Sequence, residues 1–381
     1  MSEFSRRNLL GAAAAGSVIA AASDAIAQGQ PPFGPTPAPL AGAELPSFRF
    51  RLGAVTPKSW DGGWAKEATV AEFPVSEKLA GVLMSLAPGA LRELHWHANA
   101  AEWAYVIKGQ CRVTTIDPAG HSEIADFGVG DVWYFPRGHG HSIQGIGRED
   151  CLFVLVFDNG YFSEFGTFSI SDWLGHTPPE VLAKTFGVPA QSFADFPKRE
   201  VYIAKGPVPP LAAEPPPGSL NSGALTHRYH LLAQRPETYP GGTNRLVSQR
   251  EFPISVTMTG AIMQIKPGGL RELHWHPNAD EWQYYISGRA RMSVFGSHGR
   301  VRLEEFAAGD VGYVPQGYGH YIENAGSEDL ELLIVLNNGN YESISLTGWM
   351  AANPHLLLST NFRVPESTFA SFPTRQRFMP G

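Results

Sequence analysis

Short stretches of apolar residues, or of alternating apolar and polar residues, recur along the chain, and Gly, Pro, Asn or Asp bounds each one. Clear examples in the first half are Ala80–Leu86, Trp103–Ile107, Cys111–Ile116, Val132–Phe135 and Cys151–Phe157. Many short strands separated by turn residues are typical of a β-sandwich or barrel. Helical patterns occur only later, at 171–174 and 178–183, where we expect short helices. The pattern predicts an all-β barrel followed by a small helical appendage.

This pattern is present twice. The string Arg-Glu-Leu-His-Trp-His at 92–97 returns unchanged at 271–276, an offset of 179 residues. The same offset relates many other positions up to Gly160, after which it falls to 176. We therefore expect two tandem homologous barrels, residues 47–205 and 227–381, joined by a Pro-rich linker at 206–226. The first unit holds three extra residues in the loop that follows Gly160.

The N-terminus predicts an export signal. Arginines 6 and 7 precede an apolar run at 9–22, which is too short to span a bilayer comfortably. Small residues at 25 and 27 favour cleavage after Ala27, and the paired arginines resemble a twin-arginine (Tat) signal. An uncleaved membrane anchor is the alternative. We expect residues 1–27 to be removed and a Pro/Ala-rich lead-in, 28–46, to begin a periplasmic or secreted protein with no membrane anchor.

Composition narrows the class of protein. The 381 residues include 43% hydrophobic, 11% aromatic and only 17% charged residues, which excludes a disordered chain or a coiled coil. The net charge of −7 and the absence of a basic run make nucleic acid an unexpected partner. Two cysteines, Cys111 and Cys151, cannot form a disulfide framework or a thiolate zinc cluster. They either pair once or, as we expect, remain buried free thiols.

Each unit carries a set of metal-ligand side chains. On a strand His95 and His97 face the same side, Glu102 follows after four residues, and His141 comes about forty residues later. The second unit repeats the set at His274, His276, Glu281 and His320. Six of the thirteen histidines thus recur in register, while His139, for example, is matched by Tyr318. Three imidazoles and one carboxylate predict a site for Mn, Fe, Ni, Cu or Zn in each unit.

These spacings resemble those of the two cupin motifs, and both motifs are present in each unit. In the first unit, one motif runs from Gly89 through the first three ligands to Gly109, and the other runs from Gly130 to His141. Beyond the cupin motifs, strings such as Glu-Trp-Ala-Tyr at 102–105 resemble the bicupin oxalate decarboxylases over nearly the whole mature chain. The resemblance implies two double-stranded β-helix (jelly-roll) barrels and two Mn²⁺ per chain. It also implies O2-dependent, redox-neutral conversion of oxalate, a small-molecule substrate, to formate and CO2. The sequence alone leaves a homo-oligomer open.

The resemblance assigns further roles. Alternation alone places Arg92 and Arg271, three residues before the first ligand, on the face opposite the metal, where each would form a surface salt bridge. The family instead implies that both reach the metal and stabilise negative charge, which requires a twist or bulge. The longer loop of the first unit keeps the Ser, Glu and Thr of the family lid, so Glu164 is the expected catalytic acid. Taken without the family, Glu164 would be a solvated loop carboxylate.

Two departures from the family leave alternatives open. Phe165 and Gly166 replace other lid residues, which leaves the ratio of decarboxylation to oxidation open. In the second unit Glu342 is shifted and Ile334 stands where the family has an acid, so we expect catalysis mainly at the first site. The alternatives are an oxalate oxidase that produces CO2 and hydrogen peroxide, a non-catalytic metal-binding bicupin, and a dioxygenase acting on an aromatic substrate.

Overall fold

The computed structural model describes residues 44–210 and 225–381. The predicted signal at 1–27, almost all of the lead-in and most of the linker lie outside the described residues. In the described part of the chain, no helix is long and apolar enough to cross a membrane.

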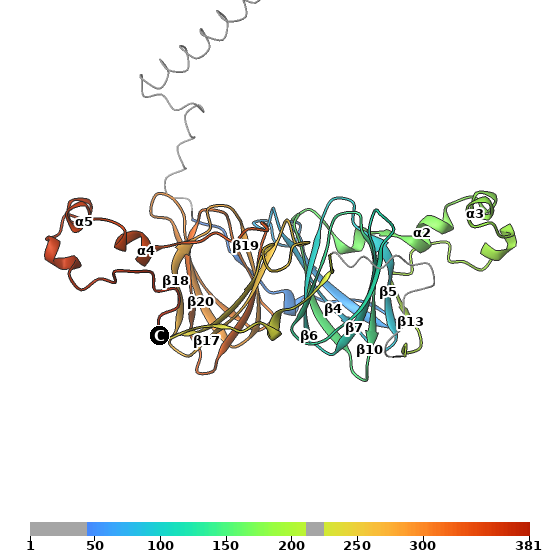
Figure 1. Ribbon diagram of the computed structural model, residues 1–381, viewed down its shortest axis with the longest axis horizontal. Helices are drawn as coiled ribbons and strands as arrows, with labels where there is room; N and C mark the ends of the chain where they lie inside the picture. Colours follow the sequence, from blue (N-terminus) through green and yellow to red (C-terminus); the bar gives the residue numbers. More distant parts are fainter. Residues whose placement is uncertain (1–43, 211–224) are drawn as a thin grey trace, which may run out of the picture. The chain divides into compact units, whose positions relative to one another are not determined.

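The first barrel consists of two antiparallel sheets (Figure 1). The larger sheet has the order β14-β9-β6-β11-β4-β3-β2. Its strands are β14 (Arg228–His230), β9 (Asp131–Phe135), β6 (Glu102–Lys108), β11 (Cys151–Phe157), β4 (Ala80–Leu86), β3 (Gly63–Ala68) and β2 (Lys58–Trp60). The smaller sheet has the order β12-β5-β10-β7-β8, and β13 also pairs with β5. Its strands are β12 (Phe168–Ser169), β5 (Ala90–Trp96), β10 (Gly140–Ile146), β7 (Gln110–Ile116), β8 (Ser122–Phe127) and β13 (Ile203–Lys205).

The second barrel repeats this arrangement. Its larger sheet contains β1 (Arg49–Phe50), β22 (Val311–Val314), β19 (Glu281–Ser287), β24 (Leu330–Leu336), β17 (Thr259–Ile265), β16 (Gly242–Val247) and β15 (Glu237–Tyr239). The smaller sheet contains β21 (Val301–Ala307), β20 (Arg289–Phe295), β23 (Gly319–Asn324), β18 (Leu270–Trp275) and β25 (Ile344–Ser345). The prediction of two all-β barrels is confirmed. The five strands expected in the first half are all present, with boundaries within one residue of those predicted.

Short helices follow each barrel, as the sequence predicts. In the first unit these are α2 (Ile170–Gly175), α3 (Pro179–Phe186) and the 3₁₀ turns η2 (Glu164–Gly166) and η3 (Ala190–Phe193). In the second they are α4 (Leu346–Ala351), α5 (His355–Phe362) and η5 (Glu366–Phe369). Two further 3₁₀ turns, η1 (Leu52–Ala54) and η4 (Leu231–Ala233), follow β1 and β14. Pro179 begins α3 and Gly187 ends it with a φ of 68°, the left-handed conformation that favours glycine.

The two barrels exchange their first strands and share a core. Strand β1 pairs with β22 of the second barrel, and β14 pairs with β9 of the first. Between the barrels Trp103 packs against Gly260, and Trp282 packs against Gly81. A Cβ at either glycine would lie 2.1 Å from the facing indole, so the contact requires glycine. One apolar cluster contains both tryptophans and buried residues from both units.

The two cysteines are buried and free, so the alternative of a disulfide is not realised in the structure. Both belong to the apolar core of the first barrel.

Candidate metal centres

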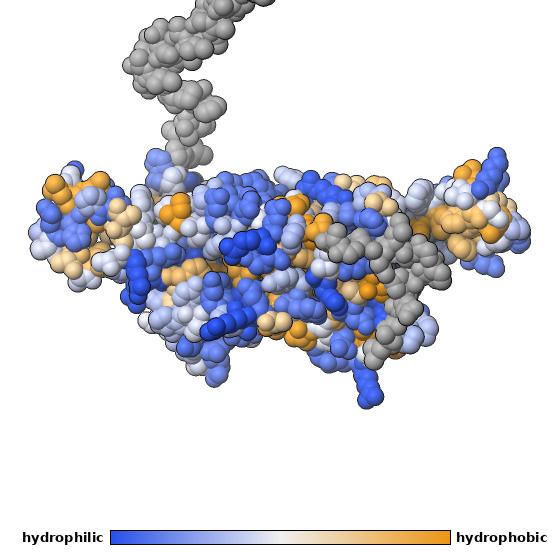
Figure 2. Space-filling model, viewed as in Figure 1, coloured by the Kyte–Doolittle hydropathy of each residue, from blue (hydrophilic) through white to orange (hydrophobic). Residues whose placement is uncertain are grey.

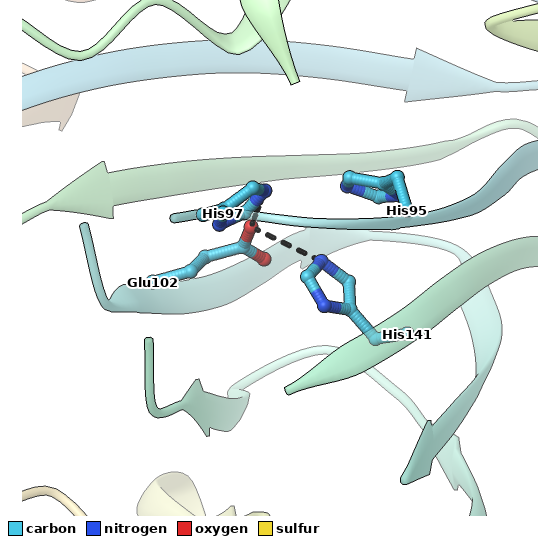
Figure 3. Close-up of side chains that lie close together, drawn as sticks. All are labelled: His95, His97, Glu102 and His141. Atoms are coloured by element: carbon cyan, nitrogen blue, oxygen red, sulfur yellow. Dashed lines mark ion pairs between the residues drawn. The ribbon is translucent and has the colours of Figure 1, made fainter. Parts of the chain in front are cut away.

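The four ligand side chains predicted in the first unit lie together inside the barrel. His95 lies on β5, His97 directly follows that strand, Glu102 begins β6 and His141 lies on β10. Their ligand atoms are all within 4.8 Å of one another, and each side chain is at most 2% exposed. Figure 3 shows the three imidazoles and the carboxylate pointing toward one another. Three separate strands therefore converge on one buried point.

The hydrogen bonds of these histidines orient them as metal ligands. Nδ1 of His95 lies 2.6 Å from the Glu93 carbonyl oxygen, and Nδ1 of His141 lies 3.0 Å from the His139 carbonyl oxygen. Because a carbonyl oxygen can only accept, Nδ1 carries the proton and Nε2 presents its lone pair to the centre. The three Nε2 atoms and Oε2 of Glu102 are buried, and none has a hydrogen-bond partner among the described residues. A divalent cation fits this donor set.

The electrostatics of the centre also favour a cation. Burial lowers the pKa of His141 to about 3 and holds the pKa values of His95 and His97 well below their usual range, so all three imidazoles are neutral. Burial raises the pKa of Glu102 to about 8, and Glu164 adds to this effect. The Trp133 indole opposes it by donating a 2.6 Å hydrogen bond to Oε1 of Glu102. A buried carboxylate beside three neutral rings needs a positive charge.

The second group has the same composition and location. His274, His276, Glu281 and His320 are buried, with ligand atoms within 4.8 Å of one another. Nδ1 of each histidine faces a backbone carbonyl oxygen, at 2.7, 2.7 and 3.1 Å. Nε2 of His276 is 2.8 Å from Oε2 of Glu281, and Nε2 of His320 is 3.5 Å from the same oxygen. Lone pairs at these distances from a carboxylate repel unless a cation or a proton lies between them, so this group also fits a metal.

A β-bulge brings Arg92 to the same face as the ligands. In the pairing of β10 with β5, His141 lies opposite His95 but Ile143 lies opposite Arg92, so β5 holds one extra residue between the two pairs. Arg92 is fully buried. Its Nη1 atom is also buried and has no hydrogen-bond partner among the described residues. The surface position expected from alternation is wrong because of this extra residue, and the bulge that the resemblance required is present.

Arg271 reaches the interior of the second barrel by the same device. Arg271 lies opposite Ile322 and His274 lies opposite His320, again with one extra residue on the strand that carries the ligands. The side chain is 1% exposed, and its Nη2 donates a 2.9 Å hydrogen bond to Oγ of Ser343. Arg271 therefore takes no part in a surface salt bridge with any other described residue.

Glu164 is directed into the first centre by the longer loop. It begins η2 and is 1% exposed, so it is not a solvated loop residue. Oε1 accepts a 2.9 Å hydrogen bond from Nε of Arg92, and Oε2 lies 3.5 Å from Nε2 of His97. Burial raises the pKa of Glu164 to about 7, although Arg92 opposes the rise. Thr167 accepts from Nη2 of Arg92 at 2.6 Å, so the loop touches this arginine at two points.

The corresponding loop of the second unit brings no acid to its centre. The side chain of Glu342 is exposed, and only its carbonyl oxygen contacts a ligand, His276. Ile334 is buried among apolar residues. Within the described ranges, the only carboxylate that pairs with the second-site histidines is that of Glu281.

Several residues that support the sites were missed by sequence reasoning. Glu93 is buried, and its Oε1 accepts hydrogen bonds from the backbone N–H groups of Val201 and Tyr202 at 2.8 and 2.6 Å. Its presence in the six-residue string shared by both units was the signal. The donors to the metal carboxylates, Trp133 and Gln283, gave no such signal because they occupy different strands in the two units.

Comparison with known proteins places the chain in a family. The cupin family model matches residues 55–192 and 229–368. Oxalate decarboxylase OxdC of Bacillus subtilis is 47% identical over 301 residues, which cover 79% of this chain and 78% of OxdC. A probable oxalate decarboxylase of Arthroderma benhamiae is 36% identical over 326 residues, which cover 84% of this chain and 80% of the relative. A solved structure of the Bacillus subtilis enzyme, studied for its Mn(II) centres, superposes with a TM-score of 0.83 at 41% identity, covering 90% of this chain and 91% of that one.

The two matched domains make this chain a cupin protein with two barrels. Within that class it belongs to the bicupin oxalate decarboxylase family.

Proposed function

We propose that this protein is a manganese-dependent oxalate decarboxylase that converts oxalate and one proton to formate and CO2. The observation that carries the proposal is the set of buried polar atoms at the first centre. The four ligand atoms, Nη1 of Arg92 and Oε2 of Glu164 are all buried without a partner among the described residues. The metal ligands, the Arg92 guanidinium and the Glu164 carboxyl group are thus buried together at one centre.

The side chains of the first centre have separate tasks. His95, His97, Glu102 and His141 would hold Mn²⁺, which supplies Lewis acidity and one-electron chemistry when it is bound. The Arg92 guanidinium attracts the anionic substrate and stabilises charge that develops on its oxygens. Loss of CO2 leaves a carbon that needs a proton, and Glu164 is placed to provide that proton. The η2 loop carries the buried Glu164, and a loop closed over the centre would limit the access of water.

We infer that catalysis occurs mainly at the first site. Support comes from Glu164, which has no counterpart among the described residues of the second site, where Ser343 contacts the arginine instead. The second metal would mainly stabilise its barrel. Dioxygen, which the family requires as a cofactor, remains part of the proposal.

The test is to load the protein with Mn²⁺, measure bound metal, and incubate it with oxalate while formate and hydrogen peroxide are both quantified. Formate in excess over peroxide supports the decarboxylase. Peroxide with little formate would instead indicate the oxidase. No turnover of oxalate by protein that holds two Mn²⁺ would contradict both and favour a non-catalytic bicupin.

We also propose that the protein is a homo-oligomer. Support comes from large apolar side chains exposed on the helical appendages: Trp173 is 64% exposed, Phe186 57%, Trp349 58% and Leu356 64%. Figure 2 shows apolar side chains gathered over the α2–α3 segment. Exposed patches of this kind are typical of association surfaces. Light scattering of the purified protein would test this, and a monomer would contradict it.

Export through the Tat pathway to the periplasm or medium stays a proposal that rests on residues 1–27. Replacing Arg6 and Arg7 with Lys should leave the protein in the cytoplasm, as cell fractionation would show. Export of the folded protein would allow Mn²⁺ to be bound before exposure to metals that bind such sites more tightly.

A further inference from the structure

Phe165, which follows the candidate acid Glu164, projects from the lid loop into a group of side chains outside it. Its ring centroid lies 6.1 Å from that of Trp60 and 5.8 Å from that of Tyr202. Nζ of Lys58 lies 3.6 Å from the centroid of the Phe165 ring, a cation–π contact. We call Trp60, Tyr202 and Lys58 the aromatic cage. Phe165 is half-buried there and packs against the apolar core of the first barrel.

The cage is fixed by the framework of the first barrel. Trp60 and Tyr202 stack with their centroids 4.2 Å apart and an interplanar angle of 26°. Tyr202 has a φ of 65°, which is unusual for a bulky residue and must be imposed by its surroundings. Buried Glu93 supplies this constraint, because its carboxylate accepts from the Tyr202 N–H and its own N–H donates to the Tyr202 carbonyl at 3.0 Å. The β5 bulge, which positions Arg92, therefore also positions the cage.

The cage directly adjoins Arg92, the side chain that we propose attracts the anionic substrate. Cζ of Arg92 lies 3.9 Å from the Tyr202 ring centroid, so one continuous stack runs from Arg92 through Tyr202 toward Phe165. Glu164 and Phe165 are successive residues of a 3₁₀ turn, where side chains point about 120° apart. When Phe165 occupies the cage outside the centre, Glu164 is directed into it. The ends of the loop are held separately, by Ser163 on Glu67 at 2.9 Å and by Thr167 on Arg92.

The second unit contains the stack without the lid residue. Tyr239 and Phe378 stand at the positions of Trp60 and Tyr202, stacked at 4.7 Å, and Cζ of Arg271 lies 3.9 Å from the Phe378 ring. Glu237 stands where the first unit has Lys58, and the shorter loop has no equivalent of Phe165. The arginine stack is thus common to both barrels, whereas the closed cage is a feature of the first.

We propose that Phe165 is a positioning residue that holds the lid closed by binding in the aromatic cage, and that this anchoring favours decarboxylation over oxidation of oxalate. This inference rests on the proposed function. With Glu164 in place, one oxalate and one proton give one formate and one CO2, with no net redox change. When the acid is withdrawn, oxalate can instead lose two electrons to dioxygen, and with two protons it gives two CO2 and one hydrogen peroxide.

The test compares the Mn-loaded full-length protein with Phe165→Ala. We expect the ratio of formate to peroxide to fall about tenfold, as for the loss of several aromatic contacts. Phe165→Tyr, which retains the ring, should keep the ratio within about twofold of the original. Phe168→Ala is the matched control, because Phe168 belongs to the next segment but stacks on Trp96, outside the cage. An unchanged ratio for Phe165→Ala, or an equal change for Phe168→Ala, would overturn the proposal.

Two further measurements complete the test. The first does not depend on turnover of oxalate, and the second uses another variant in case Phe165→Ala does not fold. Backbone hydrogen exchange at 161–167 in Mn-loaded protein without oxalate should be faster in Phe165→Ala and unchanged in Phe168→Ala. Lys58→Ala, at an exposed position, should fold normally and lower the product ratio about two- to threefold. The proposed anchoring by the cage is contradicted if hydrogen exchange at 161–167 in Phe165→Ala and the formate-to-peroxide ratio of Lys58→Ala both equal those of the parent protein. If the parent protein makes neither formate nor peroxide, the proposed function fails, and the exchange data still test the anchor.

Discussion

The two metal centres have identical ligands but different neighbours. In the first, Glu164 and Thr167 of the longer loop contact Arg92. In the second, the equivalent arginine donates to Ser343, and no loop acid enters. Because ligands, bulges and arginine stacks are shared, these features define the metal-binding framework. The loop that follows β11 or β24 distinguishes the chemistry that each framework can perform.

The carboxylate ligands are also held differently. Nε1 of Trp133 donates to Oε1 of Glu102, whereas Nε2 of Gln283 donates to Oε1 of Glu281, both at 2.6 Å. Trp133 lies directly opposite Ala104, and Gln283 lies directly opposite Gly312. In the first barrel the donor lies on β9 and its small partner on β6. In the second barrel the donor lies on β19, the equivalent of β6, and its small partner lies on β22, the equivalent of β9. Two different sequences satisfy the same requirement, namely that one carboxylate oxygen is fixed and the other is left for the metal.

The largest difference between the centres should appear when one ligand is removed from each. His141→Ala should abolish formate production, by about 10³-fold or more, because the metal at that site supplies the reaction chemistry. His320→Ala should retain formate production within about fivefold, since its centre lacks a loop acid. Elemental analysis should show that each variant loses one Mn²⁺. Equal loss of turnover in both would show that the two sites act together.

The next prediction isolates the loop acid. Glu164→Gln keeps an acceptor for Arg92 but cannot supply a proton, so formate production should fall by about 10²- to 10⁴-fold at unchanged Mn²⁺ content. Glu342→Gln, at the exposed position of the second loop, should change the rate less than about twofold. Steady-state formate assays check both. A fully active Glu164→Gln variant would remove the main distinction between the two centres.

The sequence predicted the two groups of metal-ligand side chains that lie together in the structure, because they recur at equal spacing in two copies. The strands were predicted for a similar reason, since alternation and turn residues are local signals. Arg92 shows where this reasoning fails, because an extra residue in β5 leaves the hydrophobic pattern intact yet reverses the direction of the side chain. The family resemblance, rather than the pattern, called for the bulge and for the buried position that the structure shows.

Features that depend on pairing between distant strands were not predictable from one sequence. The exchange of β1 and β14 between the barrels leaves no mark on either segment. The role of Trp133 as a donor to Glu102 depends on its cross-strand position, which the local sequence does not reveal. The export signal and the exact linker lie outside the described residues and stay predictions.

Where the two halves are alike, substitutions should have equal effects. Gly81→Ala and Gly260→Ala each place a methyl group against a tryptophan of the other barrel, and we expect each to destabilise the protein by about 2–3 kcal/mol. Gly128→Ala, which meets no atom within 4 Å, should cost less than about 0.5 kcal/mol. Denaturant unfolding of the Mn-loaded protein measures these values. A large inequality between the first two would show that the contact is not equivalent in the two halves.

The smallest effect should distinguish the two carboxylate donors. Trp133→Phe keeps most of the ring but removes the N–H that fixes Glu102, and Gln283→Leu removes the donor to Glu281. Loss of such a supporting hydrogen bond typically weakens metal binding about tenfold or somewhat more. Each variant should therefore release one Mn²⁺ to a competing chelator about tenfold more readily and leave the other site unchanged. Only Trp133→Phe should also lower formate production, because Glu102 and Glu164 belong to the same centre. If each variant instead lowered the Mn²⁺ affinity of both sites, the two donors would be acting through the overall stability of the protein. Their location on different strands would then have no effect on the individual metals.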